Sequence, residues 1–460
     1  MQEQFIALFN HINHLLWSYL LIALLIAVGI FYTFRLRFIQ ISYLPQSLIM
    51  ACSSKEGKAD GDISPFQSLM TSLAASIGIS NIAGVATAVM AGGMGAVFWM
   101  WIIAWIGMPT KYAEAVLAIK FRRQDAQGAM QGGPMVYIER GLGWKKLAMG
   151  FAFFGCLAAM AGGNLTQSHA ITHALGGLMT VNHHLIGGVM ALMTLMILWK
   201  GIRSIGIVSA YLVPLMALLY VGFGLVVIFS RLELIPGVLK LILTSAFEGQ
   251  AAMGGFVGAT VAHALQFGVS RGISSSEAGL GSAPIATAAA KTDYAARQGL
   301  IAMSGTFFSS MIICTITALT IGVSQLMGSC NQQGEVLNGV ILVMQAFKQA
   351  IPRGELIVAI GVVLFGYSTI VGWAYYGEQC FRYLFQQAPV RYFRWLFCLV
   401  VYLGAIASLE LVWPIVDVMN GMMALPNIIA LFFLSNEVIE ESEIFFKVLK
   451  AERLGVKKTA

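Results

Sequence analysis

Long apolar runs, separated by short loops that carry most of the charge, repeat along the whole chain. A helix needs about 20 apolar residues to cross the hydrocarbon core of a bilayer, and most of these runs approach or exceed that length. The pattern predicts eleven membrane-spanning helices, over residues 15–34, 65–90, 93–119, 146–175, 184–200, 205–229, 252–275, 298–327, 355–380, 393–409 and 412–435. Two amphipathic stretches, 336–350 and 234–250, are expected to lie at the membrane surface.

Two of these runs contain glycine and small hydroxyl residues, which weaken a helix, in or next to the expected span. The first interruption is Gly78-Ile79-Ser80-Asn81, and the second runs from Gly272 to Ser282. In lipid a broken helix exposes N–H and C=O groups at a cost of several kcal/mol each, so it must face protein, water or a ligand. N–H groups at a half-helix end favour an anion and free carbonyls favour a cation, which predicts a binding site at the breaks.

The two interruptions are similar in sequence and lie five spans apart. Gly-Ile-Ser begins at Gly78 and at Gly272, and Ala-Gly follows in both segments. Because five is odd, the two halves would be inverted relative to each other, as in transporters built from inverted repeats. We therefore predict one all-α transmembrane domain of one plus five plus five helices: an extra helix in 1–34, a first repeat in 65–229, a second in 252–435 and a cytoplasmic tail in 436–460.

Composition and charge agree with a polytopic membrane protein. The chain is 58% hydrophobic and 11% charged, with a formal net charge of +7. With an outside N-terminus, the basic residues of the loops fall almost entirely inside, which predicts that the C-terminus is cytoplasmic. Only Arg231, Lys240, Lys348 and Arg353 are then outside, with Lys111 and Arg271 unassigned. Basic residues confined to short loops do not indicate nucleic-acid binding, and nothing in the pattern indicates an oligomeric state.

Polar side chains near the first break are candidates for binding. The Asn81 amide is expected to hold substrate or to brace the unwound turn, with an ordinary interhelical hydrogen bond as the alternative. The Ser76 hydroxyl is a candidate oxygen ligand for a cation. Asn164 and Gln167 share one helix face in the fourth span; Gln167 either hydrogen-bonds a substrate or, like Asn164, braces the neighbouring broken helix.

The ninth span carries a second polar group, Ser368 and Thr369, with Trp373 one turn later. Thr369 and Trp373 lie on one helix face, so we expect Thr369 to contact a ligand and Trp373 to wall the pocket. Ser368, and Thr369 with it, would offer oxygen to a cation. The alternative for Trp373 is an interfacial aromatic belt, which its position well inside the span disfavours.

Ionisable residues inside the spans are functional candidates by default. Glu277 and its neighbour Ser276 are expected to organise an inner gate, and Asp417 is a second gate or proton-carrying candidate. Glu114 and Lys111 are explained by a local ion pair or by snorkelling to the membrane surface. His169 and His263 are expected to be satisfied polar residues, with proton transfer as the alternative; His183 and His184 are expected to be solvated.

These features predict a secondary transporter for a small amino acid, coupled to a cation and embedded in membrane lipid. A channel or passive facilitator, or a transporter for another amine-containing solute, remains the alternative. The sequence contains no nucleophile motif, phosphate-binding loop or metal-ligand spacing, so neither an enzyme nor a metal or other cofactor is expected.

Six motifs, in order along the chain, resemble the alanine/glycine:cation symporter family, also called the sodium:alanine symporters. They are Gly61-Asp62-Ile63-Ser64-Pro65-Phe66-Gln67, the stretch Asn81–Ala88, Phe98-Trp99-Met100-Trp101, Gly132-Gly133-Pro134-Met135, the stretch Glu277–Pro284, and Gly372-Trp373-Ala374-Tyr375-Tyr376-Gly377-Glu378. The resemblance implies the eleven-helix form of the leucine-transporter-type fold in a bacterial inner membrane, and symport of alanine or glycine, in some members of both stereoisomers, with sodium or less often a proton.

By the same resemblance, Gln167, Thr369 and Trp373 would face substrate together with the break at Gly78–Asn81, and Ser368 or Thr369 would help to hold sodium. Three segments depart from the family pattern. Ser80 replaces the second glycine of Gly-Thr-Gly-Asn, whose threonine is also lost; Ser276 replaces an asparagine; and Ser309-Ser310 stands where Asp-Thr is expected. Loss of the aspartate and of the threonine oxygen is expected to weaken sodium binding.

Overall fold

The computed structural model describes residues 11–13, 15–52, 59–125, 128–178, 182–251, 258–331, 334–386, 388–407 and 412–453. Within these ranges the chain is almost entirely helical, and its one sheet is the antiparallel pair β1 (Arg123–Gln124) and β2 (Met130–Gln131). The predicted start of the seventh span (252–257), the end of the tenth (408–409) and the last tail residues (454–460) lie outside the described residues.

Helices fill the first half of the described chain as follows: η1 (Leu16–Leu20), α2 (Leu21–Arg35), α3 (Ile39–Ser42), α4 (Leu44–Cys52), α5 (Pro65–Ser76), η2 (Ile79–Asn81), α6 (Ala83–Gly92), α7 (Gly95–Lys120), α8 (Pro134–Leu142), α9 (Lys145–Met160), η3 (Ala161–Leu165), α10 (Thr166–Gly176), α11 (His183–Trp199) and α12 (Ile202–Phe229). The second half contains η4 (Leu232–Leu234), α13 (Ile235–Glu248), α14 (Val261–Ser276), α15 (Ala283–Thr287), α16 (Ala295–Thr306), η5 (Phe307–Cys314), α17 (Thr315–Ser324), α18 (Gly339–Ala350), α19 (Gly354–Leu384), α20 (Arg391–Ile406), α21 (Val412–Phe433) and α22 (Ser435–Arg453).

Six helices of the described chain are long and apolar enough to cross a membrane, and several predicted spans are shorter. The long ones run over Gly95–Lys120, Lys145–Gly176, Ile202–Phe229, Ala295–Ser324, Gly354–Leu384 and Ile415–Phe433, and Leu21–Arg35, Ala83–Gly92 and His183–Trp199 are shorter apolar helices. The protein is therefore a multi-pass membrane protein, while the full set of eleven spans stays a prediction. The amphipathic stretch at 336–350 forms α18, which buries Leu342, Val343 and Phe347 along one face.

The first predicted interruption is present in the structure. A capping box between Ser64 and Gln67, with Pro65 at the first helical position, fixes the start of α5. The helix ends at Ser76, and Gly78 is extended (φ −123°, ψ −160°) before the short 3₁₀ turn η2 and helix α6. One predicted span is thus two half-helices joined by a non-helical turn.

The second interruption is shorter than predicted: residues Gly272–Ser276 are still helical, and the chain leaves α14 at Glu277. Glu277 adopts the left-handed conformation (φ 55°), and Gly279 and Gly281 follow with φ of 85° and 82° before the short helix α15. Glycine adopts this region readily while other residues rarely do. The Gly-Leu-Gly sequence therefore allows the chain to leave the helix and turn within the protein interior.

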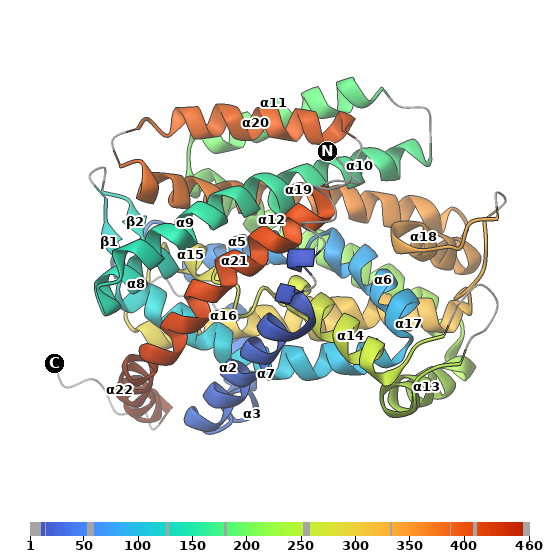
Figure 1. The fold of residues 1–460 in the computed structure, drawn as a ribbon, viewed down its shortest axis with the longest axis horizontal. Coiled ribbons are helices and arrows are strands. Elements are labelled where there is room, and N and C mark those ends of the chain that lie inside the picture. The colour runs from blue at the N-terminus through green and yellow to red at the C-terminus, as the bar shows by residue number, and fades with distance from the viewer. Residues whose placement is uncertain are drawn as a thin grey trace.

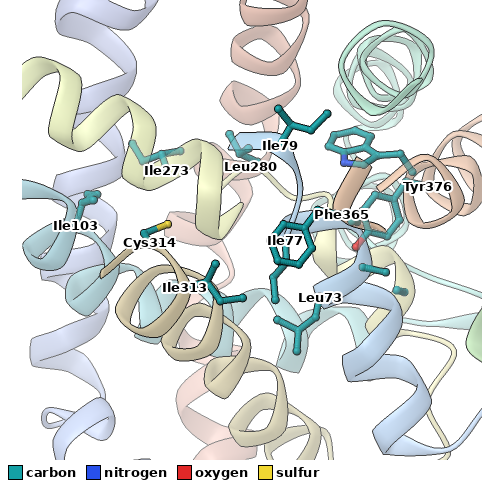
Figure 2. Close-up of a cluster of buried hydrophobic side chains, with 14 of the residues drawn as sticks. Leu73, Ile77, Ile79, Ile103, Ile273, Leu280, Ile313, Cys314, Phe365 and Tyr376 are labelled. Carbon is teal, nitrogen blue, oxygen red and sulfur yellow. The ribbon is translucent and has the colours of Figure 1, made fainter. Parts of the chain in front are cut away.

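The two interruptions lie side by side in the core of the molecule. η2 contacts α14, α5 contacts α15, and α19 packs against α5, η2 and α15 (Figure 1). Figure 2 shows Ile77 and Ile79 of the first break and Leu280 of the second in one buried cluster with Ile273 of α14 and Phe365 of α19. The most buried long helix, α7, runs behind α14. This arrangement places both breaks inside protein, where their free backbone groups can find partners.

Candidate functional site

A small cavity of about 80 Å³ lies where the first break meets α10, α14, α19 and α21. It is lined by Ala75, Gly78, Ile79, Ser80, Gly162, Thr166, Gln167, Arg271, Ser274, Glu277, Leu280, Thr369, Trp373, Val416, Asp417 and Asn420. On this measure about 10–15 Å³ is enough to hold one water, so the volume suits a solute of a few heavy atoms. Segments far apart in the sequence therefore meet around a space of the size of a small amino acid.

The predicted site residues divide into two groups. Those that line the cavity are Gly78, Ile79, Ser80, Gln167, Thr369, Trp373, Glu277 and Asp417. Those that the structure places behind its wall are Ser76, Asn81, Asn164, Ser276 and Ser368, all of them buried. The second group contacts backbone of the interrupted helices and of the helices packed against them, so its members shape the site and leave the lining to the first group.

Asn81 braces the first break from behind. Its Oδ1 accepts a hydrogen bond from the Gly78 N–H (3.1 Å), and its Nδ2 donates to the Ser309 carbonyl (3.1 Å). The Asn81 carbonyl in turn accepts from the Thr317 hydroxyl (2.9 Å). These contacts hold the turn against η5 and α17, as expected for the bracing role; direct substrate contact by Asn81 is not part of this geometry.

Gln167 reaches the break from α10. Its Nε2 donates to the Gly162 carbonyl (3.1 Å), and its Oε1 lies 3.5 Å from the Ile79 N–H, a long contact for a hydrogen bond. The Ile79 N–H is therefore weakly engaged and points toward the cavity wall. An N–H group of this kind, at the start of a helical turn, suits a carboxylate.

Hydroxyl and carbonyl oxygens gather where α19 crosses α5. The Ala74 carbonyl oxygen lies 3.2 Å from Thr369 Oγ1 and 3.4 Å from Ser368 Oγ. Both hydroxyls also lie 2.9 Å from the Phe365 carbonyl oxygen, to which they can donate. Oxygen donors are the ligands that sodium-like hard cations prefer. Ser76 is not part of this group, because its hydroxyl donates to Ser72 on its own helix (3.1 Å).

Two glycines permit the close approach of α19. A Cβ on Gly78 would lie 2.6 Å from Thr369 Oγ1, and a Cβ on Gly163 would lie 2.3 Å from the Cβ and Cγ of Trp373. The Trp373 side chain is 6% exposed and lines the cavity, which supports the predicted pocket wall over an interfacial aromatic belt.

Arg271 was not predicted as a site residue, although it is a basic residue inside a span. Its guanidinium lines the cavity, and its buried Nε has no hydrogen-bond partner among the described residues. Asp417 is the carboxylate that interacts with it electrostatically across the cavity. Asp417 also holds the N-terminal helix, because its carbonyl accepts from Trp17 Nε1 (2.8 Å) and its Oδ2 from Asn13 Nδ2 (3.4 Å). An Arg inside an apolar run was the signal that could have identified it.

The expectation for Lys111 and Glu114 was wrong. Both side chains are buried (2% and 0% exposed), so they do not snorkel, and they are not an ion pair. Lys111 Nζ donates to the Ser276 carbonyl (2.7 Å) at the end of α14, and Glu114 Oε1 accepts from the Gly281 N–H (3.0 Å). The two charges therefore serve the second break, whose freed backbone groups they satisfy.

Asn427 completes the support of this turn, and no pattern along the chain singles it out. Its Nδ2 donates to Glu114 Oε1 (2.7 Å) and to the Gly279 carbonyl (2.9 Å). Glu277 Oε2 accepts from the Ser282 hydroxyl (2.8 Å) across the same turn. Glu277 thus organises the turn while lining the cavity.

Asn164 has a bracing role at another place, because its Nδ2 donates to the Phe397 carbonyl of α20 (2.8 Å).

Comparisons with known proteins agree with this architecture. The profile of the sodium:alanine symporter family matches residues 2–459. The sodium/alanine symporter AgcS of Methanococcus maripaludis is 46% identical over 97% of this chain and 99% of its own length. The probable sodium/glutamine symporter GlnT of Bacillus subtilis is 36% identical over 95% and 90%. Among solved structures, MhsT in complex with L-phenylalanine shares the fold, with a TM-score of 0.58 and 14% identity over 84% of this chain and 93% of that one.

Proposed function

The chain belongs to the sodium:alanine symporter family, and we propose that it takes up alanine or glycine, including D-alanine, with sodium or a proton by alternating access. Cation-coupled amino-acid symport is the activity of this family of transporters, and the chain is accordingly not an enzyme. The choice of solute, the ion and the transport cycle are the proposed part. The observation that carries them is the cavity of about 80 Å³ at the meeting point of two interrupted helices.

The substrate would bind as a zwitterion. The Ile79 N–H, weakly engaged by Gln167, is offered to its carboxylate, and Thr369 and Trp373 bound the space left for its side chain. Because the cavity holds little more than the backbone atoms of an amino acid, a small side chain is favoured. A larger amine-containing solute is the alternative; a named relative, GlnT, is described as a probable glutamine symporter.

The cation would bind next to the substrate, at the oxygens of Ala74, Ser368 and Thr369. Bound there it would join α19 to the last turn of α5, directly before the break. Ion and substrate would then each favour the same arrangement of these helices, and such differential affinity for two states is what couples their movement.

The proposed frame is eleven spans in the inner membrane, with the N-terminus outside and the C-terminus in the cytoplasm. The extra helix at 1–34, the inverted repeats at 65–229 and 252–435 and the tail at 436–460 belong to this proposal. The side-by-side position of the two breaks supports it, since each break lies in the helix that the repeat requires.

Uptake into proteoliposomes tests the proposal. With an inward sodium gradient, labelled alanine should accumulate above equilibrium, and unlabelled glycine and D-alanine should compete. Replacing sodium at constant pH, and separately collapsing a proton gradient, identifies the ion. Uptake that only equilibrates, whatever the gradient, would establish a passive facilitator, and no uptake of alanine, glycine or serine would rule out the substrate class.

A pair of variants tests the cation site. Thr369→Val removes one hydroxyl with little change in shape and should raise the sodium concentration for half-maximal uptake by roughly tenfold, the equivalent of ~1.4 kcal/mol. Ser76→Ala is the matched control, because its hydroxyl only bonds its own helix. Equal sodium dependence in Thr369→Val and in the unmodified protein would exclude Thr369 as a ligand.

A further inference from the structure

Three histidines line one cavity at the far end of α10, and two of them, His169 and His183, were expected to be a satisfied and a solvated polar residue. This cavity, of about 570 Å³, contains His169 and His173 on α10 and His183 at the first position of α11. Asn338, the residue before α18, and Val340, Ile341 and Met344 of α18 also line it, and its lining contains neither Asp nor Glu. The described residues thus bring together imidazoles from two helices and place them in an accessible space apart from the substrate cavity.

His169 and His173 are four residues apart, the spacing that places two imidazoles one above the other on a helix face. Their ring centroids are 5.4 Å apart and the ring planes are inclined by 45°. His173 is exposed, so its ring can rotate toward its neighbour. This His-x-x-x-His arrangement is the one by which a helix offers two nitrogen ligands to a zinc ion.

The second contact of His169 prepares it as a ligand. Its Nδ1 lies 3.0 Å from the Ala407 carbonyl. A carbonyl only accepts, so Nδ1 carries the hydrogen and Nε2 keeps its lone pair. Metal-binding histidines almost always have such a partner on the second ring nitrogen, because it fixes the tautomer and the ring orientation.

We propose that His169 and His173 form a zinc-binding site, with water and His183 supplying the remaining positions. The described residues contain no preformed group of three ligands, so the ion would join the rings by drawing the exposed His173 and His183 inward. An all-imidazole site suits zinc, copper or nickel and does not suit magnesium or calcium, which require oxygen ligands. His169 is half a turn from Gln167, so a bound ion would restrain the segment of α10 that reaches the first break and slow uptake.

Calorimetric titration of the purified full chain with zinc chloride tests this site without any transport measurement. One zinc should bind per chain, and His173→Ala should weaken binding at least tenfold. His184→Ala is the matched control: its Nδ1 is paired with the Tyr402 hydroxyl (2.8 Å) and its ring does not line the cavity. Magnesium should not bind there.

Absence of saturable zinc binding, or equal binding by the unmodified chain and His173→Ala, would overturn the site. Equal losses in His173→Ala and His184→Ala would do so too, since they would place the ion elsewhere. Thermal unfolding without metal verifies that His173→Ala is folded, as expected for an exposed side chain. A chain that binds zinc but carries no alanine would refute the proposed function and leave this site standing.

Discussion

Replacing Gly163 by alanine probes how closely the site is packed. The new Cβ would lie 2.3 Å from the Cβ and Cγ of Trp373, against an ordinary carbon–carbon contact of about 3.5 Å. One of the two must therefore move by about 1.2 Å. Helix α19 is also packed closely against α5, because a Cβ on Gly372 would lie 2.8 Å from the Ala75 nitrogen, and this contact limits how far the helix can move. We expect the indole to shift into the cavity.

The magnitude follows from the cost of overpacking, which is typically about 1–3 kcal/mol. If that cost falls on the substrate-bound state, the Michaelis constant for alanine should rise roughly five- to 150-fold, since each ~1.4 kcal/mol is a factor of ten. If it falls on folding, the protein should unfold at a lower temperature. Proteoliposome uptake and thermal unfolding in detergent distinguish the two.

Gly150→Ala is the control, because it lies in the same predicted span and a Cβ there would meet no atom within 4 Å. Alanine should leave uptake unchanged there and raise stability by up to ~1 kcal/mol, its helix-propensity advantage over glycine. The reasoning is refuted if Gly163→Ala matches Gly150→Ala in both uptake and unfolding temperature.

Three further outcomes are expected. Asn81→Ala leaves the buried Gly78 N–H without its acceptor and should lower stability by about 1–3 kcal/mol, measured by thermal unfolding; an unchanged transition would remove the bracing role. Glu114→Ala and Asn427→Ala should be non-additive, with a coupling of about 0.5–3 kcal/mol in a double-mutant cycle, and additive effects would mean that their 2.7 Å contact is unimportant. Gly78→Ala should impair sodium-dependent uptake, since its Cβ would lie 2.6 Å from Thr369 Oγ1; wild-type sodium dependence would contradict this.

Buried charges show where reasoning along the chain fails. Lys111 and Glu114 are near each other in sequence, so a local pair was the simplest prediction. In the fold, each is closer to a backbone group of the second break than to the other. Nothing in the sequence specifies which carbonyl or N–H a long side chain will reach once a neighbouring helix unwinds.

Hydropathy and glycine content by themselves indicated that this chain crosses a membrane and that two of its segments leave the helix, because lipid admits few backbone structures and glycine marks the exceptions. They placed the start of the second break at Gly272, whereas α14 continues to Ser276. The tertiary structure alone decided that Asn81 and Ser368 lie behind the cavity wall and that Arg271 lines the cavity together with Asp417. Which side of a buried helix faces a ligand depends on how its neighbours pack. A helix that is apolar on all sides has no polar face in its sequence that would indicate this side.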